Sequence, residues 1–514
     1  MGAVTRNILT ITEPTIKVDP FDIPDIESGQ GGGNNDNKSA NKDKLSKQAG
    51  DTSPAIRINE YDFNAEQILS FSLTIDGLLP TLSVTVSDSK GAFSKSQYPK
   101  DGDVLMLFIR SKDEEIFKPI RMDFDIINVE APPISNTGQS MEAPTSSGKT
   151  NEEVIYTFEC KAKIPDLLAE DCFGYPEDTT FNHLEKLATE MKIGFASNVT
   201  DTDDKMPRIC PYDTRLKFIK EYTNSAYLDE NSFFTSYIDL YYYLNFVNIN
   251  DQLKYDEEME DTITSTLQDL TKRKNDTEGN NGSTSKLFLT NLEKGSAGTN
   301  RYINAYSLVN NAGLITLKNG YARTIQYYDD DEKEYRFFKI EPSITENLPE
   351  DLVPLRGRND EDRYLKQVKY KYLGRQSSNE AEGNSHLNYQ YARISNYQNN
   401  QDIYKLYLVL EIQQANMALY RFQKVPLIIY ETDAKKSKTE EQKEKNAADA
   451  GTQRSDKDKL EKGDSKTNNS NEPKINKYLT GVYVIGKIEY FYSSNDQGIT
   501  QRLTMLRREW PHRI

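Results

Sequence analysis

Apolar and polar residues alternate over several short stretches in the first half of the chain, and this period of two predicts β-strands. The alternation is regular over residues 69–75 and 82–86, on either side of a break rich in glycine and proline, which predicts an antiparallel pair. Residues 120–126 alternate equally well, whereas residues 104–109 are apolar at every position and predict a strand covered on both faces. We therefore expect residues 56–163 to form a first small antiparallel β-barrel or sandwich.

Helical signals follow the first β-region. Ile164 and Pro165 predict the start of a short helix that ends at Gly174, because proline is tolerated in a first helical turn. Residues 178–194 carry an apolar stripe at helical spacing, and Gly194 is expected to be the left-handed cap that ends this second helix.

Residues 212–250 are the stretch around which the chain is organised. Asp213 or Thr214 is expected to cap a helix, and apolar residues at spacings of three and four follow it. Aromatic and β-branched residues come next and predict a β-hairpin with Asp239 and Leu240 near its turn. This helix and hairpin close an α+β module over residues 164–250, which we interpret as the joint between two β-regions. Five aromatic residues of the hairpin are expected to be structural: Phe233, Phe234, Tyr241, Tyr243 and Phe246.

A second antiparallel β-barrel is predicted over residues 287–514. Its expected strands are residues 313–318, 321–328, 335–340, 404–412, 424–430, 479–492 and 499–509. Residues 329–333 (DDDEK) read as a hairpin tip, and the spacing and glycine of a calcium loop are missing there. The fold class predicted for the whole chain is mainly β, with an α+β insertion between two antiparallel β-barrel domains.

Polar tracts separate these regions. Residues 1–27 predict an extended N-terminal arm punctuated by prolines, and residues 28–55 a disordered linker of Gly, Asn, Lys, Asp and Ser. Residues 251–286 are expected to be a linker or insertion. Residues 431–477 are crowded with both charges and predict a disordered insertion in the second β-region.

The composition limits the classes of function. A chain of 514 residues is too long for one core, and its net charge of −16 argues against a protein that grips nucleic acid by its phosphates. Three cysteines without C-x-x-C spacing favour reduced thiols over a disulfide framework. No apolar run reaches the length needed to span a bilayer, so we expect no membrane insertion.

A search for catalytic and ligand-binding residues predicts none. The three histidines, His183, His386 and His512, are scattered, and the sequence motifs of serine hydrolases, zinc proteases and P-loop enzymes do not occur. A zinc site of Cys172, His183 and Cys210 fits no ligand spacing. We therefore expect no catalytic, cofactor-binding or metal-binding residue, no cofactor and no enzymatic activity.

The order of these elements resembles the baseplate central hub proteins of contractile-tailed bacteriophages, a family that includes late control protein D and the type VI secretion spike proteins. In that family a segment similar to residues 213–219 (DTRLKFI) precedes an aromatic hairpin. Residues 419–430 (LYRFQKVPLIIY), 479–486 (LTGVYVIG) and 501–510 (QRLTMLRREW) look like the second barrel of hubs from large phages. The resemblance covers residues 56–510 without the linkers.

This resemblance implies a structural virion protein. Such hubs are trimers with two tail-tube-like barrels per chain, so three copies adapt a six-fold tail tube to a three-fold central spike and line the DNA channel. The implied partners are a homotrimer, the tail tube protein, the central spike protein and baseplate wedge proteins. The implied location is the tail baseplate of the virion, after synthesis in the host cytoplasm. Two alternatives stay open: another baseplate or neck component, and a peptidoglycan-degrading tail enzyme.

Overall fold

The structure of the chain is a computed structural model. It describes residues 8–16, 52–59, 61–63, 66–88, 93, 102–111, 118–130, 154–254, 259, 263, 287–291, 302–311, 314, 323–329, 333–340, 352–354, 369–376, 385–412, 414–431, 475–494, 498–507 and 509–511. Residues 28–51 of the predicted linker 28–55, nearly all of residues 255–286 of the predicted insertion 251–286, residues 432–474 of the predicted insertion 431–477, and the predicted strand 313–318 apart from Leu314 lie outside these residues. The linker prediction is wrong for Thr52 to Ala55, which begin strand β2 (Thr52–Ile58) because they pair with residues 108–111.

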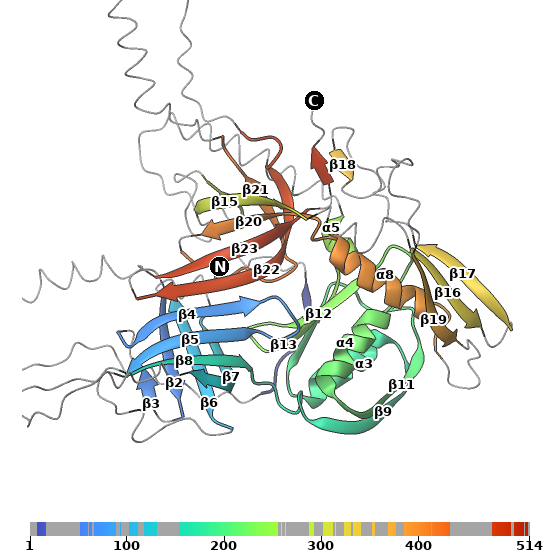
Figure 1. Cartoon of the computed structure of the whole chain (residues 1–514), viewed down its shortest axis with the longest axis horizontal. Coiled ribbons are helices and arrows are strands. Elements are labelled where there is room, and N and C mark those ends of the chain that lie inside the picture. The colour runs from blue at the N-terminus through green and yellow to red at the C-terminus, as the bar shows by residue number, and fades with distance from the viewer. Residues whose placement is uncertain are drawn as a thin grey trace, which may run out of the picture.

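The protein is mainly β, with large antiparallel sheets and an α+β insertion, which confirms the predicted fold class (Figure 1). A thirteen-stranded sheet runs through both predicted β-regions in the order β15-β20-β23-β22-β4-β5-β8-β7-β6-β2-β3, with β14 and β21 attached at β22. One connected hydrophobic core extends from Ile8 to Leu506 and contains residues of both β-regions and of the α+β module.

The first β-region is a sheet that curls around a cluster of aromatic rings. Its strands are β2 (Thr52–Ile58), β3 (Tyr61–Phe63), β4 (Ile68–Ile75), β5 (Thr81–Asp88), β6 (Val104–Ser111), β7 (Ile120–Glu130) and β8 (Val154–Ala162). Phe63 on β3 and Phe158 on β8 both pack against Phe93, with ring centroids 5.2 and 6.0 Å away. Four strand spacings of about 4.8 Å would separate β3 from β8 in a flat sheet, so the sheet must curl to bring both to one ring.

The strand predictions in this region hold with one correction. The antiparallel pair β4–β5 and the one-face-buried strand β7 are confirmed. The expectation that residues 104–109 are covered on both faces is wrong. Leu105, Leu107 and Ile109 are buried, but Val104 and Met106 are only half-buried, because no described element covers the outer face of the sheet there.

The helix predicted over residues 164–174 is wrong. Glu170–Asp178 is strand β9, which pairs with β11 (Met206–Thr214) in a two-stranded ribbon. The helix predicted from Pro165 does not form because an extended strand lets Phe173 and Tyr175, two residues apart, both face the helices beneath the ribbon. Each has its ring in contact with that of Phe218.

The second predicted helix is α3 (Thr180–Glu190), with Thr179 as its N-cap. Gly194 is not its left-handed cap, which corrects the prediction; Lys192 has the positive φ, of 61°. Gly194 instead begins strand β10 (Gly194–Ser197). A Cβ there would lie 2.5 Å from Cδ1 of Tyr243 and 2.9 Å from the carbonyl oxygen of Thr12, so the close approach of strands excludes a side chain.

The helix and hairpin of residues 212–250 are confirmed. Thr214 is the N-cap of α4 (Arg215–Ser225), and β12 (Phe234–Ile238) pairs with β13 (Tyr243–Asn248), which leads into α5 (Ile249–Leu253). A four-stranded sheet has the order β1-β10-β13-β12, so β1 (Leu9–Thr12) of the predicted N-terminal arm adds an antiparallel edge strand to this module.

The strands of the second β-region belong to three sheets. The large sheet contains β14 (Leu289–Thr290), β15 (Ile303–Asn310), β20 (Leu406–Ile412), β21 (Lys424–Ile428), β22 (Gly481–Ser493) and β23 (Ile499–Leu506). A separate sheet of β16 (Arg323–Asp329), β17 (Glu334–Ile340) and β19 (Lys369–Gln376) projects beside α8 (Tyr389–Asp402), as Figure 1 shows. A short pair joins β18 (Leu352–Pro354) to β24 (Glu509–Pro511). The predicted strands correspond to β16, β17 and β20 to β23, whereas β15, β19 and α8 were not predicted.

Candidate functional site at the junction of the β-regions

Strand β22 joins the two β-regions through its own length. Its first part, from Gly481 to Val484, pairs with β21 of the second β-region, and its later part, from Ile488 to Ser493, pairs with β4 of the first. The register against β23 shifts between Ile485 and Lys487, at the point where β22 changes partners. A bulge at such a place bends the strand, so one continuous strand can serve both regions.

Gly486 lies at this bulge because a side chain would not fit there. A Cβ on Gly486 would lie 2.7 Å from Cδ1 and 2.9 Å from Cγ of the fully buried Leu506, and 3.2 Å from the hydroxyl oxygen of Tyr404. The carbonyl oxygen of Gly486 accepts hydrogen bonds from Nε of Arg421, at 2.7 Å, and from the Tyr404 hydroxyl, at 3.3 Å.

Arg421 connects three parts of the molecule. Besides its bond to Gly486 on β22, its Nη1 donates to the carbonyl oxygen of Gly77 in the β4–β5 turn, at 2.9 Å. Its own carbonyl oxygen accepts a hydrogen bond of 2.7 Å from the hydroxyl of Tyr237 on β12. The guanidinium carbon lies 4.7 Å from the ring centroid of Phe422, and the side chain is 7% exposed. The bonds to Gly486 and from Tyr237 are therefore shielded from water, whereas the bond to Gly77 is part-buried.

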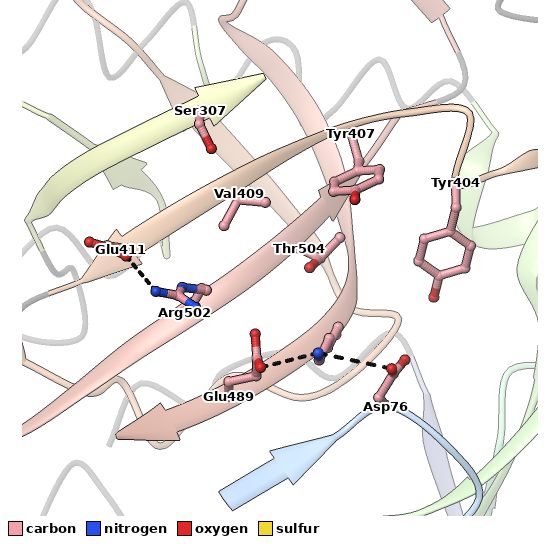
Figure 2. A pocket seen from close by; sticks show the side chains of 10 residues that line it. Asp76, Ser307, Tyr404, Tyr407, Val409, Glu411, Glu489, Arg502 and Thr504 are labelled. Atoms are coloured by element: carbon pink, nitrogen blue, oxygen red, sulfur yellow. Dashed lines mark hydrogen bonds and ion pairs between the residues drawn. The ribbon is translucent and has the colours of Figure 1, made fainter. Parts of the chain in front are cut away.

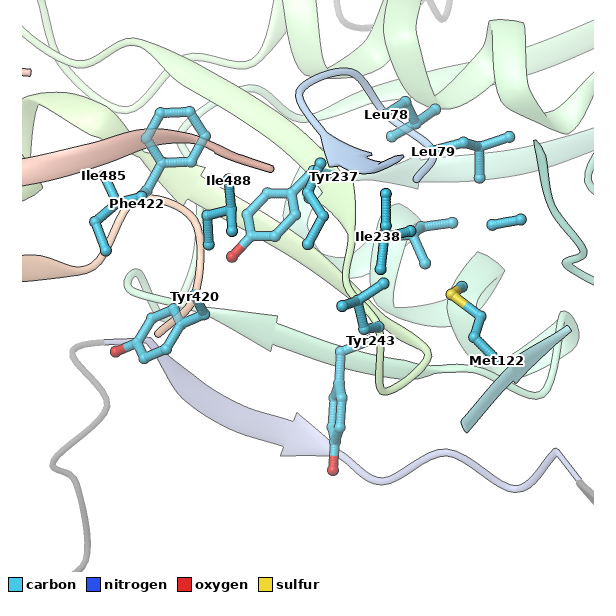
Figure 3. Close-up of a cluster of buried hydrophobic side chains, with 14 of the residues drawn as sticks. Leu78, Leu79, Met122, Tyr237, Ile238, Tyr243, Tyr420, Phe422, Ile485 and Ile488 are labelled. Atoms are coloured by element: carbon cyan, nitrogen blue, oxygen red, sulfur yellow. The ribbon is translucent and has the colours of Figure 1, made fainter. Parts of the chain in front are cut away.

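The hairpin β12–β13 fills the space between the regions with apolar side chains. Figure 3 shows Leu78 and Leu79 of the first β-region beside Ile238, and Ile488 of the second beside Tyr237. The backbone N–H of Ile238 donates to the carbonyl oxygen of Leu78 at 2.8 Å. The hairpin turn also reaches β7, because the backbone N–H of Asp123 donates to the Tyr242 hydroxyl at 2.8 Å. The hairpin half of residues 212–250 therefore forms the joint.

Helix α8 holds the other side of the hairpin. Nδ2 of Asn396 lies 2.9 Å from the carbonyl oxygens of both Asn224 and Ala226, at the end of α4, where helix carbonyls lack intrahelical partners. Oδ1 of Asn396 accepts from the N–H of Phe234, and Asn400 donates to the carbonyl oxygen of Phe234, each at 2.9 Å. Two asparagines one turn apart thus bond both backbone groups of Phe234, at the start of the free edge of β12.

A buried polar cluster lies beneath this contact. Arg208 donates from Nη1 to the Ser225 hydroxyl and from Nη2 to the Thr180 hydroxyl, both at 3.0 Å. Burial lowers the pKa of Arg208, and the nearby carboxylate of Asp204 opposes that shift. His386 reaches the carbonyl oxygen of Ser225 through Nε2 at 3.1 Å, and burial lowers the pKa of His386 to about 4. The cluster therefore links α4 to the segment before α8 with a histidine that is neutral at pH 7.

An open groove of about 540 Å³ crosses the outer face of the large sheet beside the junction (Figure 2). Its acidic side chains are held by basic neighbours. Lys487 lies 3.1 Å from Glu489 and 4.0 Å from Asp76, and Arg502 lies 2.8 Å from Glu411. Carboxylates that are each paired with a basic side chain indicate a charged surface. A general acid and a general base would instead need two groups whose environments give them different pKa values.

The residues singled out from the sequence fall in different places. Of the five hairpin aromatics, Phe233, Phe234, Tyr243 and Phe246 are buried, and Tyr241 is half-buried against the core. The contacts of Arg421 and Asn396 were not anticipated, because their partners lie far away in the sequence.

The zinc alternative gains no support from the described residues. His183 contacts the carbonyl oxygen of Pro176 and stacks on Tyr175, and the thiol of Cys210 lies 3.3 Å from the carbonyl oxygen of Asp213. Cys172 is exposed on the outside of the ribbon. Within the described ranges no three His, Cys, Asp or Glu side chains are placed to hold a metal ion, and no helix is long and apolar enough to cross a bilayer. His512 lies outside these ranges.

Comparisons with known proteins give structural likenesses only. No family model and no curated protein matches the sequence. A tail protein from Neisseria meningitidis has a TM-score of 0.45 and 9% identity, covering 89% of this chain and 96% of that one. The 43 kDa tail protein of prophage MuSo2 from Shewanella oneidensis has a TM-score of 0.44 and 8% identity, covering 89% of this chain and 98% of that one. An E. coli component of the type VI secretion system has a TM-score of 0.38 and 8% identity, covering 89% and 77%. None of these three scores reaches 0.5, so the likenesses carry no functional argument.

Proposed function

We propose that this chain is a structural protein of a phage-type tail and that it serves as the central hub of the baseplate. In this role three copies form a closed ring that adapts a six-fold tail tube to a three-fold spike. Its partners are then the tube protein, the spike protein and the wedge proteins around them.

The observation that carries this proposal is the continuous junction of the two β-regions. A ring of three chains can present six similar faces only if the two β-regions of each chain keep a fixed relative position. Strand β22 pairs with both regions, and Arg421 bonds to Gly77 on one side and Gly486 on the other. These contacts supply the rigidity that an adaptor needs.

The sequence adds two supports. The order of β-region, α+β module and second β-region resembles that of the hub family. The net charge of −16 suits a channel through which DNA passes without binding, because like charges repel the phosphates.

The test combines oligomeric state with location. The purified chain, alone or with its tube and spike proteins, is expected to scatter light as a trimer, and a reconstruction of the virion is expected to place it on the tail axis between tube and spike. A stable dimer in the presence of the tail proteins, or a position away from the axis or in the neck, would overturn the hub assignment. Peptidoglycan cleavage abolished by one carboxylate substitution would favour the enzymatic alternative.

A further inference from the structure

The outer face of the β9–β11 ribbon carries apolar side chains where a covering layer normally presents polar ones. The inner face, with Tyr175, Arg208 and Cys210, is buried against α3 and α4. Figure 1 shows the ribbon curving around the outside of these helices, at the periphery of the molecule. On the outward face, Ile209 is 70% exposed and Tyr212 is 77% exposed. Apolar side chains this exposed do not contribute to covering the core, so they indicate a surface that contacts another molecule.

The exposed side chains of the ribbon's outward face, together with Leu168 just before it, make up what we call the ribbon patch: Leu168, Cys172, Ile209, Pro211 and Tyr212. Cys172 is directly opposite Pro211 in the ladder, and Ile209 is opposite Gly174. Leu168 lies just before the ribbon begins and is 52% exposed. Gly174 adds a shallow notch beside Ile209, since a Cβ there would meet only the Arg208 carbonyl oxygen, at an ordinary 3.6 Å.

Tyr212 is pushed outward by a strained backbone. The ladder shifts register between Pro211 and Asp213, so Tyr212 is the extra residue of a β-bulge, and its φ is 53°. A bulky residue rarely adopts a positive φ, and bulges are a means of re-aiming a side chain. Within the described part of this chain, the strained backbone does not lead to burial of the Tyr212 ring, because the ring is mostly exposed to solvent.

The rim of the ribbon patch is acidic. Asp171 and Asp213 are already paired, with Arg215 at 3.2 Å and Lys217 at 2.7 Å. Asp166, Glu170 and Glu177 are exposed and form no ion pair with any described residue. Two copies meeting through the same patch would bring these like charges together, which disfavours a symmetric self-contact.

From these observations we infer that the ribbon patch binds a protein segment with apolar side chains at its centre and lysine or arginine at its ends. The apolar centre would cover Ile209 and Tyr212, and the basic ends would pair with Glu170 and Glu177. This inference stands apart from the proposed hub role, because it depends only on the ribbon and requires neither a trimer nor a tail.

The test uses two short fluorescent peptides with one shared apolar centre, flanked by lysines in one and by glutamates in the other. Fluorescence anisotropy with the full chain is expected to show that the lysine-flanked peptide binds at least about tenfold more tightly and that added salt weakens it. The double variant Ile209→Thr and Tyr212→Ser should weaken that binding by at least about tenfold. Glu170→Lys with Glu177→Lys should remove the preference for lysine.

The control is Leu308→Ser, which removes an apolar side chain that is 52% exposed from β15 and should leave binding unchanged. In the unaltered chain the lysine-flanked peptide should slow alkylation of Cys172, the one exposed cysteine of the three. Equal affinity for the two peptides, no binding of either, or unchanged binding by the Ile209 and Tyr212 variant would overturn the inference. The hub proposal would then still stand or fall on oligomeric state and position in the virion.

Discussion

Arg421 donates a hydrogen bond from Nη1 to the carbonyl oxygen of Gly77, at 2.9 Å, across a sequence separation of 344 residues. This hydrogen bond connects a loop of the second β-region to the β4–β5 turn of the first. The same guanidinium holds Gly486 on β22, so one side chain spans the junction at the place where β22 changes partners. Substitution of these residues therefore tests how the two β-regions are held together.

Replacing Arg421 is expected to loosen the junction. Arg421→Ala removes the charged donor from the part-buried carbonyl oxygen of Gly77 and leaves that of buried Gly486 with only the 3.3 Å bond from Tyr404. It also removes the packing on Phe422, so it should lower the free energy of unfolding by about 3 kcal/mol. Urea denaturation measures this loss. The control is Arg502→Ala, whose ion pair with Glu411 is about half exposed and should contribute no more than about 1 kcal/mol. Equal losses of unfolding free energy in the two variants would show that Arg421 contributes no more than an exposed ion pair.

A side chain at the bulge of β22 is expected to be destabilising. Gly486→Ala places a methyl group within 2.9 Å of two atoms of the buried Leu506, and this overpacking should cost about 1 to 3 kcal/mol. Gly77→Ala is the matched control, because a Cβ there would meet nothing within 4 Å. Thermal melting of both variants distinguishes the sites. A Gly486→Ala variant that melts like Gly77→Ala would mean that Leu506 can move aside.

Asn396 offers a test of the contact between α8 and the hairpin. Asn396→Asp keeps the shape but turns a donor amide into a carboxylate facing the carbonyl oxygens of Asn224 and Ala226, which should destabilise by about 3 kcal/mol or more. Asn231→Asp, at an exposed position, should change stability by less than about 0.5 kcal/mol. Limited proteolysis should then show faster cleavage around α8 in Asn396→Asp alone.

Stability is expected to fall in mild acid. Burial lowers the pKa of His386 to about 4 in the folded chain, whereas an unfolded histidine titrates near 6.5, so the unfolded state takes up the proton first. The stability associated with neutral His386 is fully present above about pH 6.5 and is lost as pH falls toward 4, with a slope of up to about 1.4 kcal/mol per pH unit.

Urea denaturation at several pH values tests this with His386→Gln, which keeps a polar side chain but does not titrate. The variant should show a shallower slope between pH 6.5 and 4 than the unaltered chain. Some slope should remain, because burial also lowers the pKa of His183. An unchanged slope would contradict the role assigned to His386.

Elements with a strong local pattern were predicted well. The pair β4–β5, strand β7 and helix α4 with its cap at Thr214 follow from period two, period 3.6 and capping chemistry, which are local properties. Helix α8 was missed because its buried face is polar, including Gln390, Asn396 and Asn399, and carries no apolar stripe. Strand β9 was mistaken for a helix because the evidence for it is its partner β11, which comes about thirty residues later.

By itself the sequence determined the mainly β class, the position of the aromatic hairpin and the burial of most of its rings. Each of these follows from residue types within a short window. Only the tertiary structure decided that β22 would pair with β4, that Arg421 would bridge Gly77 and Gly486, and that Ile209 and Tyr212 would face outward. The physical reason is that a hydrogen bond between distant segments leaves no mark on either local pattern. It depends on where the whole fold brings the two groups.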